Sequence, residues 1–321
     1  MTASPDTTHD AEDVTLTVLN YNGRDLLPVI LTSIFEQTAS GFRVHVLDDA
    51  SSDDSLVYLA ERWPQVRVLP SRANRGISAS MARAVASAET TYVAVLNNDL
   101  ELDPRWLAEM RATLERHPEA AAADGKMLNF HRRGELDGAG DTMGRDGYPR
   151  RRGQGEPDAG QYDEPGEVFS ATGGAALFRR GAFEEVGPFD SDLGAYYEDV
   201  DWGFRARLQG MTVRYAPTAV SYHMGSATTS RDSGRYAALI VRNQMIVVLK
   251  DFPATLLLRH LPRILFFELK WAIFNALHGL GGAHARGTLA AAQALPDTLR
   301  KRRAIQRSRS APLHELERAL S

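Results

Sequence analysis

Four times in the first 116 residues, a short run of apolar and β-branched residues leads into a polar turn and then an amphipathic stretch. The runs predict strands over Val14–Leu19, Arg43–Leu47, Val66–Leu69 and Tyr92–Leu96. The stretches predict helices over Leu26–Gln37, up to Trp63, over Ile77–Ala88 and over Pro104–Arg116. Because strands alternate with helices, we expect an α/β fold with a mostly parallel sheet and helices on both faces.

Polar side chains follow each predicted strand at its carboxyl end. They are Asn20 and Asn22, Asp48 and Asp49, Asn74 and Arg75, and Asn97 to Asp99. In parallel sheets the carboxyl ends of the strands form one rim, and ligands bind there. Helix capping or turn closure is an alternative for Asn22, Ser51 or Asp53 taken singly, but it explains the whole set less well.

Composition removes several classes of protein. The 321 residues are 43% hydrophobic and 24% charged, which is ordinary for a folded domain, and the absence of cysteine excludes a disulfide scaffold or a cysteine nucleophile. No Gly-x-Gly-x-x-Gly follows the first strand and no P-loop motif occurs, which argues against a dinucleotide oxidoreductase or a P-loop NTPase. A bound phosphate would then be neutralised most simply by a divalent cation on carboxylates.

Ordered motifs carry a resemblance to a known family. They are Leu19-Asn20-Tyr21-Asn22, Asp48 to Asp53, Asn74-Arg75-Gly76, Leu96 to Asp99, Glu198-Asp199-Val200-Asp201-Trp202, and His223 in Tyr-His-Met-Gly-Ser. Over about Val14 to Arg242 the chain resembles the inverting glycosyltransferases of family 2, which have a GT-A fold. The Asn-Asn-Asp motif and the downstream His-x-Gly-Ser look most similar to the rhamnosyltransferase and galactofuranosyltransferase-like branch.

The resemblance implies a metal site and a donor site. Asp99 matches the metal-binding end of the family's Asp-x-Asp motif, and His223 matches a metal-binding imidazole, so both would hold Mg²⁺ or Mn²⁺. Asn97 replaces the first Asp of that motif. Asp49 would accept a hydrogen bond from a uracil or thymine ring. The implied donor-binding residues are Leu19, Asn20, Tyr21, Asn22, Asp49, Asn74, Arg75, Asn97 and Asn98.

The resemblance also implies a catalytic base and an acceptor side. An inverting transferase needs a group that takes the proton of the acceptor hydroxyl, and Asp199 aligns with the family's base. N-terminal capping of the following helix is the alternative for this acidic cluster. The acceptor side would comprise Thr172, Gly173, Gly174, Glu198 and Trp202. We predict a mobile loop or lid for the Gly-, Arg- and Pro-rich segment from Phe130 to Glu167.

Basic and acidic residues are unevenly distributed along the chain. Residues 250–321 hold 12 Lys and Arg against 5 Asp and Glu, whereas residues 1–249 hold 25 against 36. We therefore predict a disordered tail over 1–13, a GT-A domain over 14–235 and a basic, amphipathic helical region over 236–321. The polar N-terminus resembles neither a secretory signal nor a membrane anchor. The basic helices are typical of a helix lying in an anionic membrane interface; packing on the body and a homodimer interface are the alternatives.

The predicted function is metal-dependent transfer of a sugar, rhamnose first, from a dTDP or UDP donor to a cell-surface glycan or its lipid-linked precursor. A nucleotidyltransferase and a non-catalytic nucleotide-sugar or glycan-binding module are the alternatives. The acidic body and the lack of a base-stacking module argue against nucleic acid as a partner. The expected location is the cytoplasm, at the inner face of the plasma membrane if the helices bind lipid.

Overall fold

The computed structural model describes residues 9–225 and 233–321. Residues 1–8 of the predicted tail and Ser226 of the His223 motif lie outside the described residues. The other end of that tail is folded, which corrects the prediction of disorder up to residue 13. His9–Asp10 forms β1, pairs with β3 (Ala39–Ser40), and leads into the buried Ala11.

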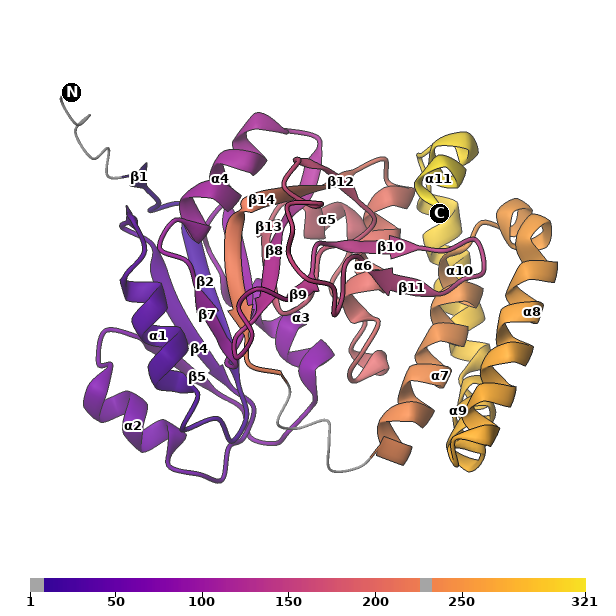
Figure 1. The fold of residues 1–321 in the computed structure, drawn as a ribbon, viewed down its shortest axis with the longest axis horizontal. Helices are drawn as coiled ribbons and strands as arrows, with labels where there is room; N and C mark the ends of the chain where they lie inside the picture. The colour runs from indigo at the N-terminus through magenta and orange to yellow at the C-terminus, as the bar shows by residue number, and fades with distance from the viewer. Residues whose placement is uncertain (1–8, 226–232) are drawn as a thin grey trace.

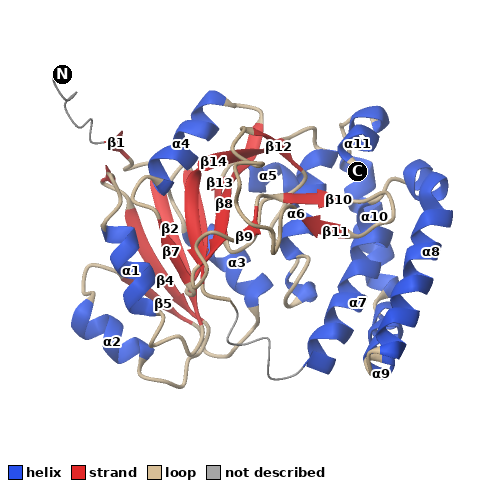
Figure 2. Ribbon diagram, in the orientation of Figure 1, coloured by secondary structure: helices blue, strands red, loops and turns tan. Residues whose placement is uncertain are grey.

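A ten-stranded sheet forms the centre of the molecule (Figures 1 and 2). Its main path runs β12-β14-β8-β13-β6-β2-β4-β5, with β7 on β14 and β9 on β8. The strands are β2 (Val14–Asn20), β4 (Arg43–Asp48), β5 (Arg67–Pro70), β6 (Tyr92–Asn97), β7 (Leu100–Leu102), β8 (Ala120–Asn129), β9 (Leu136–Gly138), β12 (Gly166–Val168), β13 (Ala175–Arg179) and β14 (Thr212–His223).

Strand direction explains why the polar residues that follow the strands lie together at one edge of the sheet. β6, β2, β4 and β5 are parallel, as predicted, so their carboxyl ends lie together. β13 is antiparallel to β6 and begins at that same rim, with Ala175 opposite Leu96. The segment that precedes β13 therefore meets the ends of the parallel strands.

Helices cover both faces of the sheet. α1 (Leu27–Phe35), α2 (Ser55–Arg62) and α4 (Trp106–Arg116) pack their apolar residues on one face. α3 (Ile77–Ser87), α5 (Ala182–Val186) and α6 (Glu198–Leu208) pack on the other face. The fold is the expected α/β architecture, and the predicted strands and helices of the first 116 residues all occur, with ends shifted by one or two residues.

The segment from Phe130 to Glu167, for which we predict a mobile loop or lid, contains regular secondary structure. It contains β9, the antiparallel pair β10 (Asp141–Met143) and β11 (Pro149–Arg151), and the start of β12. Ion pairs join Arg151 to Asp137 and Asp141. These ion pairs connect β11 to β9 and β10 beside the sheet.

The C-terminal helices form a group at one end of the sheet, on the right in Figure 1. They are α7 (Ser233–Asp251), α8 (Ala254–Leu277), α9 (Gly281–Gln293), α10 (Leu295–Ser308) and α11 (Leu313–Ala319). A shared apolar cluster joins α7, α8, α10 and α11 to α6 and to the 3₁₀ turn η1 (Ser191–Leu193), and α9 packs on α7 and α8. Within the described residues, no helix has the length and hydropathy that a bilayer span requires.

Candidate active site

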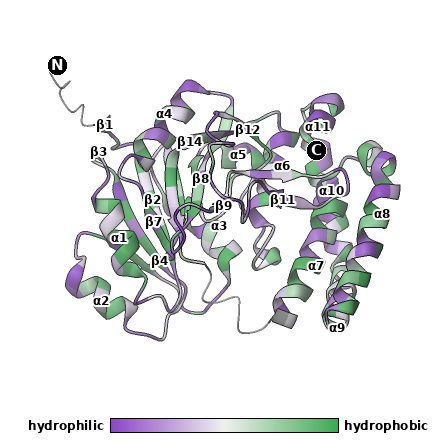
Figure 3. Cartoon of the chain, in the orientation of Figure 1, coloured by the Kyte–Doolittle hydropathy of each residue, from purple (hydrophilic) through white to green (hydrophobic). Residues whose placement is uncertain are grey.

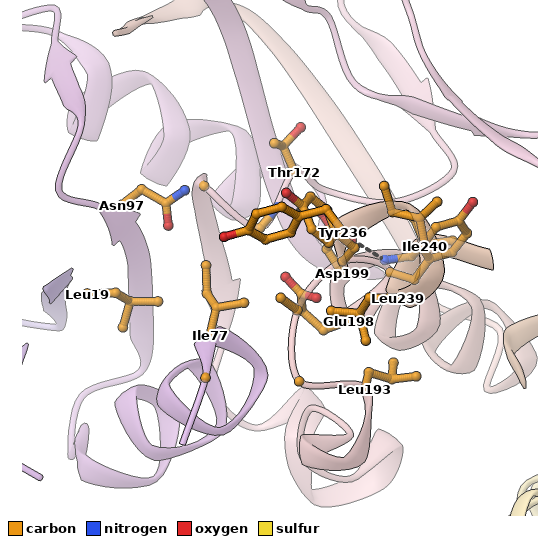
Figure 4. Close-up of a pocket in the computed structure, with 18 of the residues that line it drawn as sticks. Leu19, Ile77, Asn97, Thr172, Leu193, Glu198, Asp199, Tyr236, Leu239 and Ile240 are labelled. Carbon is orange, nitrogen blue, oxygen red and sulfur yellow. Dashed lines mark hydrogen bonds between the residues drawn. The ribbon is translucent and has the colours of Figure 1, made fainter. Parts of the chain in front are cut away.

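A cleft of about 1620 Å³ opens at the carboxyl ends of the parallel strands. Leu19 of β2 and Asn97 of β6 lie on its sheet side, and Leu239 and Ile240 of α7 lie on the opposite side (Figure 4). The cleft therefore lies between the α/β body and the C-terminal helices.

Four groups predicted to act together, Asp49, Asp99, Asp199 and His223, all line this cleft. Every predicted site residue except Asn22 and Trp202 lies on its wall. These are Leu19, Asn20, Tyr21, Asp49, Asn74, Arg75, Asn97, Asn98, Asp99, Thr172, Gly173, Gly174, Glu198, Asp199 and His223.

Strand register joins the ends of β2 and β4. Asn20 lies opposite Asp48, and its Nδ2 donates a hydrogen bond to Asp48 Oδ2 at 2.9 Å. Asp48 also accepts from the backbone N–H and the hydroxyl of Ser51, and Asn98 Nδ2 donates to Asn20 Oδ1 at 2.9 Å. Since Asp48 is fully buried and fully partnered, it fixes the rim, while its neighbour Asp49 faces the cleft.

The Asp49 carboxylate holds the loop before α3. It accepts hydrogen bonds from the backbone N–H groups of Arg75, at 3.0 and 3.2 Å, and of Gly76, at 3.0 Å. Asn74 Oδ1 also accepts from the Gly76 N–H. Two carboxylate oxygens have about four acceptor positions. The N–H group of a nucleobase would therefore bind Asp49 alongside these backbone N–H groups or would displace the loop from the carboxylate.

Asp99 and His223 lie together because β7 and β14 pair directly after Asp99. His223 is opposite Leu100, and His223 Nε2 lies 3.1 Å from Asp99 Oδ2. The other ring nitrogen, Nδ1, lies 3.1 Å from Asp137 Oδ2. Burial would lower the pKa of His223, but the bonds to both carboxylates outweigh burial and raise it to about 9.

These two residues suit a divalent cation on one side of the cleft. An imidazole nitrogen and a carboxylate oxygen face each other, and Asp137 orients the imidazole from behind, as carboxylates do behind metal-bound histidines. Among the described residues, no group of three or more His, Asp or Glu side chains forms a metal cage. A cation here would take its other ligands from phosphate oxygens and water.

Asp199 lies at the start of α6 on the opposite side of the cleft from Leu19 (Figure 4). Its Oδ2 accepts from the Gly173 N–H at 2.9 Å, and its Oδ1 accepts from the Val200 N–H at 2.8 Å. A Cβ atom on Gly173 would stand 3.3 Å from the Asp199 side chain, so the glycine permits this close approach. The bonds fix the carboxylate and leave further acceptor positions on its oxygens.

The backbone before Asp199 is strained. Tyr196 and Tyr197 have φ angles of 67° and 71°, in the left-handed region that costs non-glycine residues energy. Asn243 of α7 holds this segment, because its buried Nδ2 donates to the carbonyls of Leu193, Ala195 and Tyr196 at 2.8–2.9 Å. The C-terminal helices therefore help to build the site.

Glu198 is buried directly beside Asp199. Burial, together with the Asp199 charge, raises its pKa to about 8, and Ser78 Oγ lies 3.5 Å from its carboxyl group. Around neutral pH, Glu198 is therefore largely protonated. The two neighbouring carboxyl groups therefore have different surroundings: Glu198 is buried next to Ser78, whereas Asp199 accepts two backbone N–H bonds.

Comparison with known proteins agrees with this geometry. The sequence profile of the family described as glycosyl transferase family 2 matches residues 15–187, which is more than half of the chain. The chain belongs to glycosyl transferase family 2. It is therefore a glycosyltransferase, and the nucleotidyltransferase and non-catalytic alternatives are set aside.

Two curated relatives match about two thirds of this chain. The chain is 27% identical over 253 residues to the N-acetylglucosaminyl-diphospho-decaprenol L-rhamnosyltransferase of Mycobacterium tuberculosis (strain CDC 1551 / Oshkosh), covering 67% of this chain and 81% of that protein. It is 26% identical to the O-antigen biosynthesis protein RfbC of Myxococcus xanthus over 65% of this chain, but the match spans only 17% of RfbC.

Solved structures show that the fold is that of the GT-A glycosyltransferases. The mannosyltransferase PcManGT from Pyrobaculum calidifontis, solved with GDP-Man and Mn²⁺, aligns with a TM-score of 0.57 at 19% identity, covering 92% of this chain and 84% of that one. GalNAc-T7, solved with UDP, GalNAc and Mn²⁺, aligns with a TM-score of 0.61 at 16% identity, covering 74% of this chain and about half (47%) of that one.

Two predicted site residues of this family 2 enzyme lie outside the cleft wall. Asn22 is not among the residues that line the cleft, and its Oδ1 accepts from the Ser52 N–H at 2.7 Å in the neighbouring turn. Trp202 is in the core, because its ring stacks on Phe183 and its Nε1 donates to the Gly187 carbonyl. At the i+3 position from Asp199, Trp202 points to the sheet instead of the acceptor side.

Sequence reasoning missed Asp137 and Asn243, and it noted Arg151 only as part of the run Arg150-Arg151-Arg152, for which it predicts a solvated surface or contact with a phosphorylated acceptor. Asp137 lies behind His223, and Arg151 bridges Asp137 to the buried Asp141. Burial would raise the pKa of Asp137, but the bond to His223 and the Arg151 charge hold it below its usual value. No local motif marks these residues, since their partners lie far away along the chain.

Proposed function

We propose that this enzyme transfers a sugar, with rhamnose as the first candidate, from a dTDP- or UDP-linked donor to a hydroxyl of a cell-surface glycan or its lipid-linked precursor. The observation that carries the proposal is that Asp199 and the Asp99–His223 pair line one cleft together with Asp49. The similarity to a mycobacterial rhamnosyltransferase and to an O-antigen biosynthesis protein supports the choice of sugar and acceptor.

The nucleoside would lie between Leu19–Tyr21 and Asp49. A carboxylate accepts hydrogen bonds, so Asp49 suits a uracil or thymine ring, which presents an N–H group. Arg75 follows in the loop that Asp49 holds, and its exposed side chain would lie near the diphosphate. Asn97 and Asn98 would face the ribose or the sugar.

The reaction would be a single displacement. Asp199 takes the proton of the acceptor hydroxyl while the acceptor oxygen bonds to the anomeric carbon. The bond from that carbon to the β-phosphate oxygen breaks, the nucleoside diphosphate leaves, and the anomeric centre inverts. The Gly173 and Val200 N–H groups keep the Asp199 carboxylate aimed at the acceptor.

Asp99 and His223 would hold Mg²⁺ or Mn²⁺, with Asp137 orienting the His223 ring. Such a cation supplies a Lewis acid for the charge that develops on the leaving phosphate. The structures of PcManGT and GalNAc-T7 with Mn²⁺ support this choice of cofactor. The acceptor places the reaction at the cytoplasmic face of the plasma membrane, with the protein in peripheral contact.

Asp199→Asn tests the proposed base, and Asp25→Asn, an exposed carboxylate outside the cleft, is the matched control. We expect Asp199→Asn to lower transfer about 10²- to 10⁴-fold. Thermal stabilisation by dTDP- or UDP-sugars with Mn²⁺ should persist, since a ligand at a hundred times its Kd adds about 2.7 kcal/mol. Unchanged turnover would remove Asp199 from this role, and no stabilisation by either donor class would remove the donor assignment.

A further inference from the structure

α8 has one face that packs against the protein. Leu256 and Ile264 are buried on this face, and Asn275 near the end of the helix is buried as well. Phe267 also turns inward and contacts the ring of Tyr148 at a centroid distance of 4.7 Å. These contacts fix the rotation of α8 about its axis and so decide which residues face outward.

The outward face of α8 is a continuous apolar surface. Six large apolar side chains on it are 51–79% exposed: Leu258, Leu265, Phe266, Leu269, Ile273 and Leu277. Their spacing of mostly three and four residues places them on one side of a helix. Figure 3 shows hydrophobic residues along this outer helix. A monomeric soluble protein rarely exposes such a contiguous patch without a binding role.

Three basic residues border this apolar surface. Arg259, Arg263 and Lys270 are exposed, and at 100° per residue they fall within a sector of about 40° along one edge of it. Arg259 is ion-paired with Glu317 of α11, so Arg263 and Lys270 are the cations that this edge offers to a partner. The one acidic residue within α8, Glu268, lies on the inner side, where its carboxyl group meets Gln244. The exposed surface of α8 therefore combines apolar and positive groups without a carboxylate.

We infer that this outward face of α8 docks on an anionic lipid surface. An interfacial helix buries its apolar face at the boundary between headgroups and acyl chains and keeps its cations at the phosphates. A second copy of the chain would bring the same cations, and no exposed carboxylate of α8, to the contact. Charge complementarity therefore favours lipid over self-association.

The docking surface and the cleft are connected through Tyr148. This residue lines the cleft and packs on Phe267 and on Trp271, at 4.7 and 5.6 Å between ring centroids. A bilayer on the outer face of α8 would therefore lie one helix away from the helical side of the cleft. This consequence rests on the proposed function, since only a lipid-linked acceptor would benefit from it.

Vesicle binding by the full chain tests the inference. The wild-type protein should sediment together with phosphatidylcholine vesicles that contain phosphatidylglycerol. The variant Leu265→Glu/Leu269→Glu should bind at least about a hundredfold more weakly, because two leucine side chains lose their burial. Val57→Glu, at an exposed apolar position of α2 on the α/β body, is the matched control and should bind as the wild type does.

A second variant separates charge from apolar burial. Arg263→Gln/Lys270→Gln should weaken binding to the anionic vesicles about fivefold per residue removed and leave weak binding to pure phosphatidylcholine unchanged. The inference is overturned if the wild type ignores both vesicles, if Leu265→Glu/Leu269→Glu binds normally, or if the outer face of α8 proves to form a dimer.

Activity on a water-soluble acceptor keeps this inference apart from the proposed function. Both variants should transfer sugar to that acceptor at the wild-type rate, since none of the four residues lines the cleft. Vesicle binding without any sugar transfer would remove the proposed reaction and leave the docking surface in place. Transfer without vesicle binding would do the reverse.

Discussion

Asn243 gives a sharp test of whether the C-terminal helices build the active site. The substitution Asn243→Asp keeps the size and shape of the side chain but replaces its N–H donors with a carboxylate oxygen. That oxygen would face the carbonyls of Leu193, Ala195 and Tyr196, which all stand 2.8–2.9 Å from Nδ2. The new carboxylate oxygen and the three carbonyl oxygens are all hydrogen-bond acceptors, and residue 243 is fully buried, so water cannot bridge them.

The magnitude follows from the bonds that are lost. The Asn243 amide has two hydrogens for three carbonyls, so two bonds are the minimum loss, and an unsatisfied buried carbonyl costs about 1–3 kcal/mol. The free energy of unfolding should fall by about 2–6 kcal/mol unless the segment relaxes. Relaxation is favoured, because Tyr196 and Tyr197 would lose their left-handed φ angles. Relaxation of this segment would displace the neighbouring Asp199.

Denaturant unfolding and steady-state kinetics measure the two consequences separately. We expect a loss of stability and at least about a tenfold fall in kcat, with the donor Kd changed less, because Leu19 and Asn97 lie across the cleft from α7 (Figure 4). The control is Asn275→Asp, a buried asparagine of α8 bonded to His284. The reasoning fails if Asn243→Asp and Asn275→Asp lose stability equally and both keep the wild-type kcat.

Two further predictions concern packing and pH. Gly173→Ala would place a Cβ 3.1 Å from the Met81 side chain and 3.3 Å from Asp199, so kcat should fall about tenfold with little change in Tm. Gly134→Ala is the control, because no atom lies within 4 Å of the added Cβ at that position. Equal kcat values for the two variants would contradict the argument. Burial raises the pKa of Glu268 to about 7 from 4.5, so the folded state binds its proton more tightly and this contribution to stability is lost as pH rises from about 4.5 to 7. Glu268→Gln should flatten the dependence of unfolding free energy on pH in that window by at most about 3 kcal/mol; an unchanged slope in chemical denaturation would show that Glu268 does not titrate there.

Much of the rim could be predicted because its signals are local. A strand such as Val14–Asn20 is apolar over its length and polar at its end, and parallel pairing then places Asn20, Asp49 and Asn97 together. Asn22 and Trp202 belong to the same motifs but face elsewhere. A motif fixes the order of residues, whereas a turn or a helix fixes the direction of each side chain.

The sequence by itself determined the alternation of strands and helices, the acidic rim and the basic, apolar character of the last helices, since each depends on neighbours within one or two turns of chain. Only the tertiary structure decided that Asp137 stands behind His223, that Asn243 supports the backbone before Asp199, and that one face of α8 packs inward while the other is left exposed. The physical reason is that these contacts join segments far apart along the chain. Their geometry follows from how the sheet and the helices pack, which no short stretch of residues encodes.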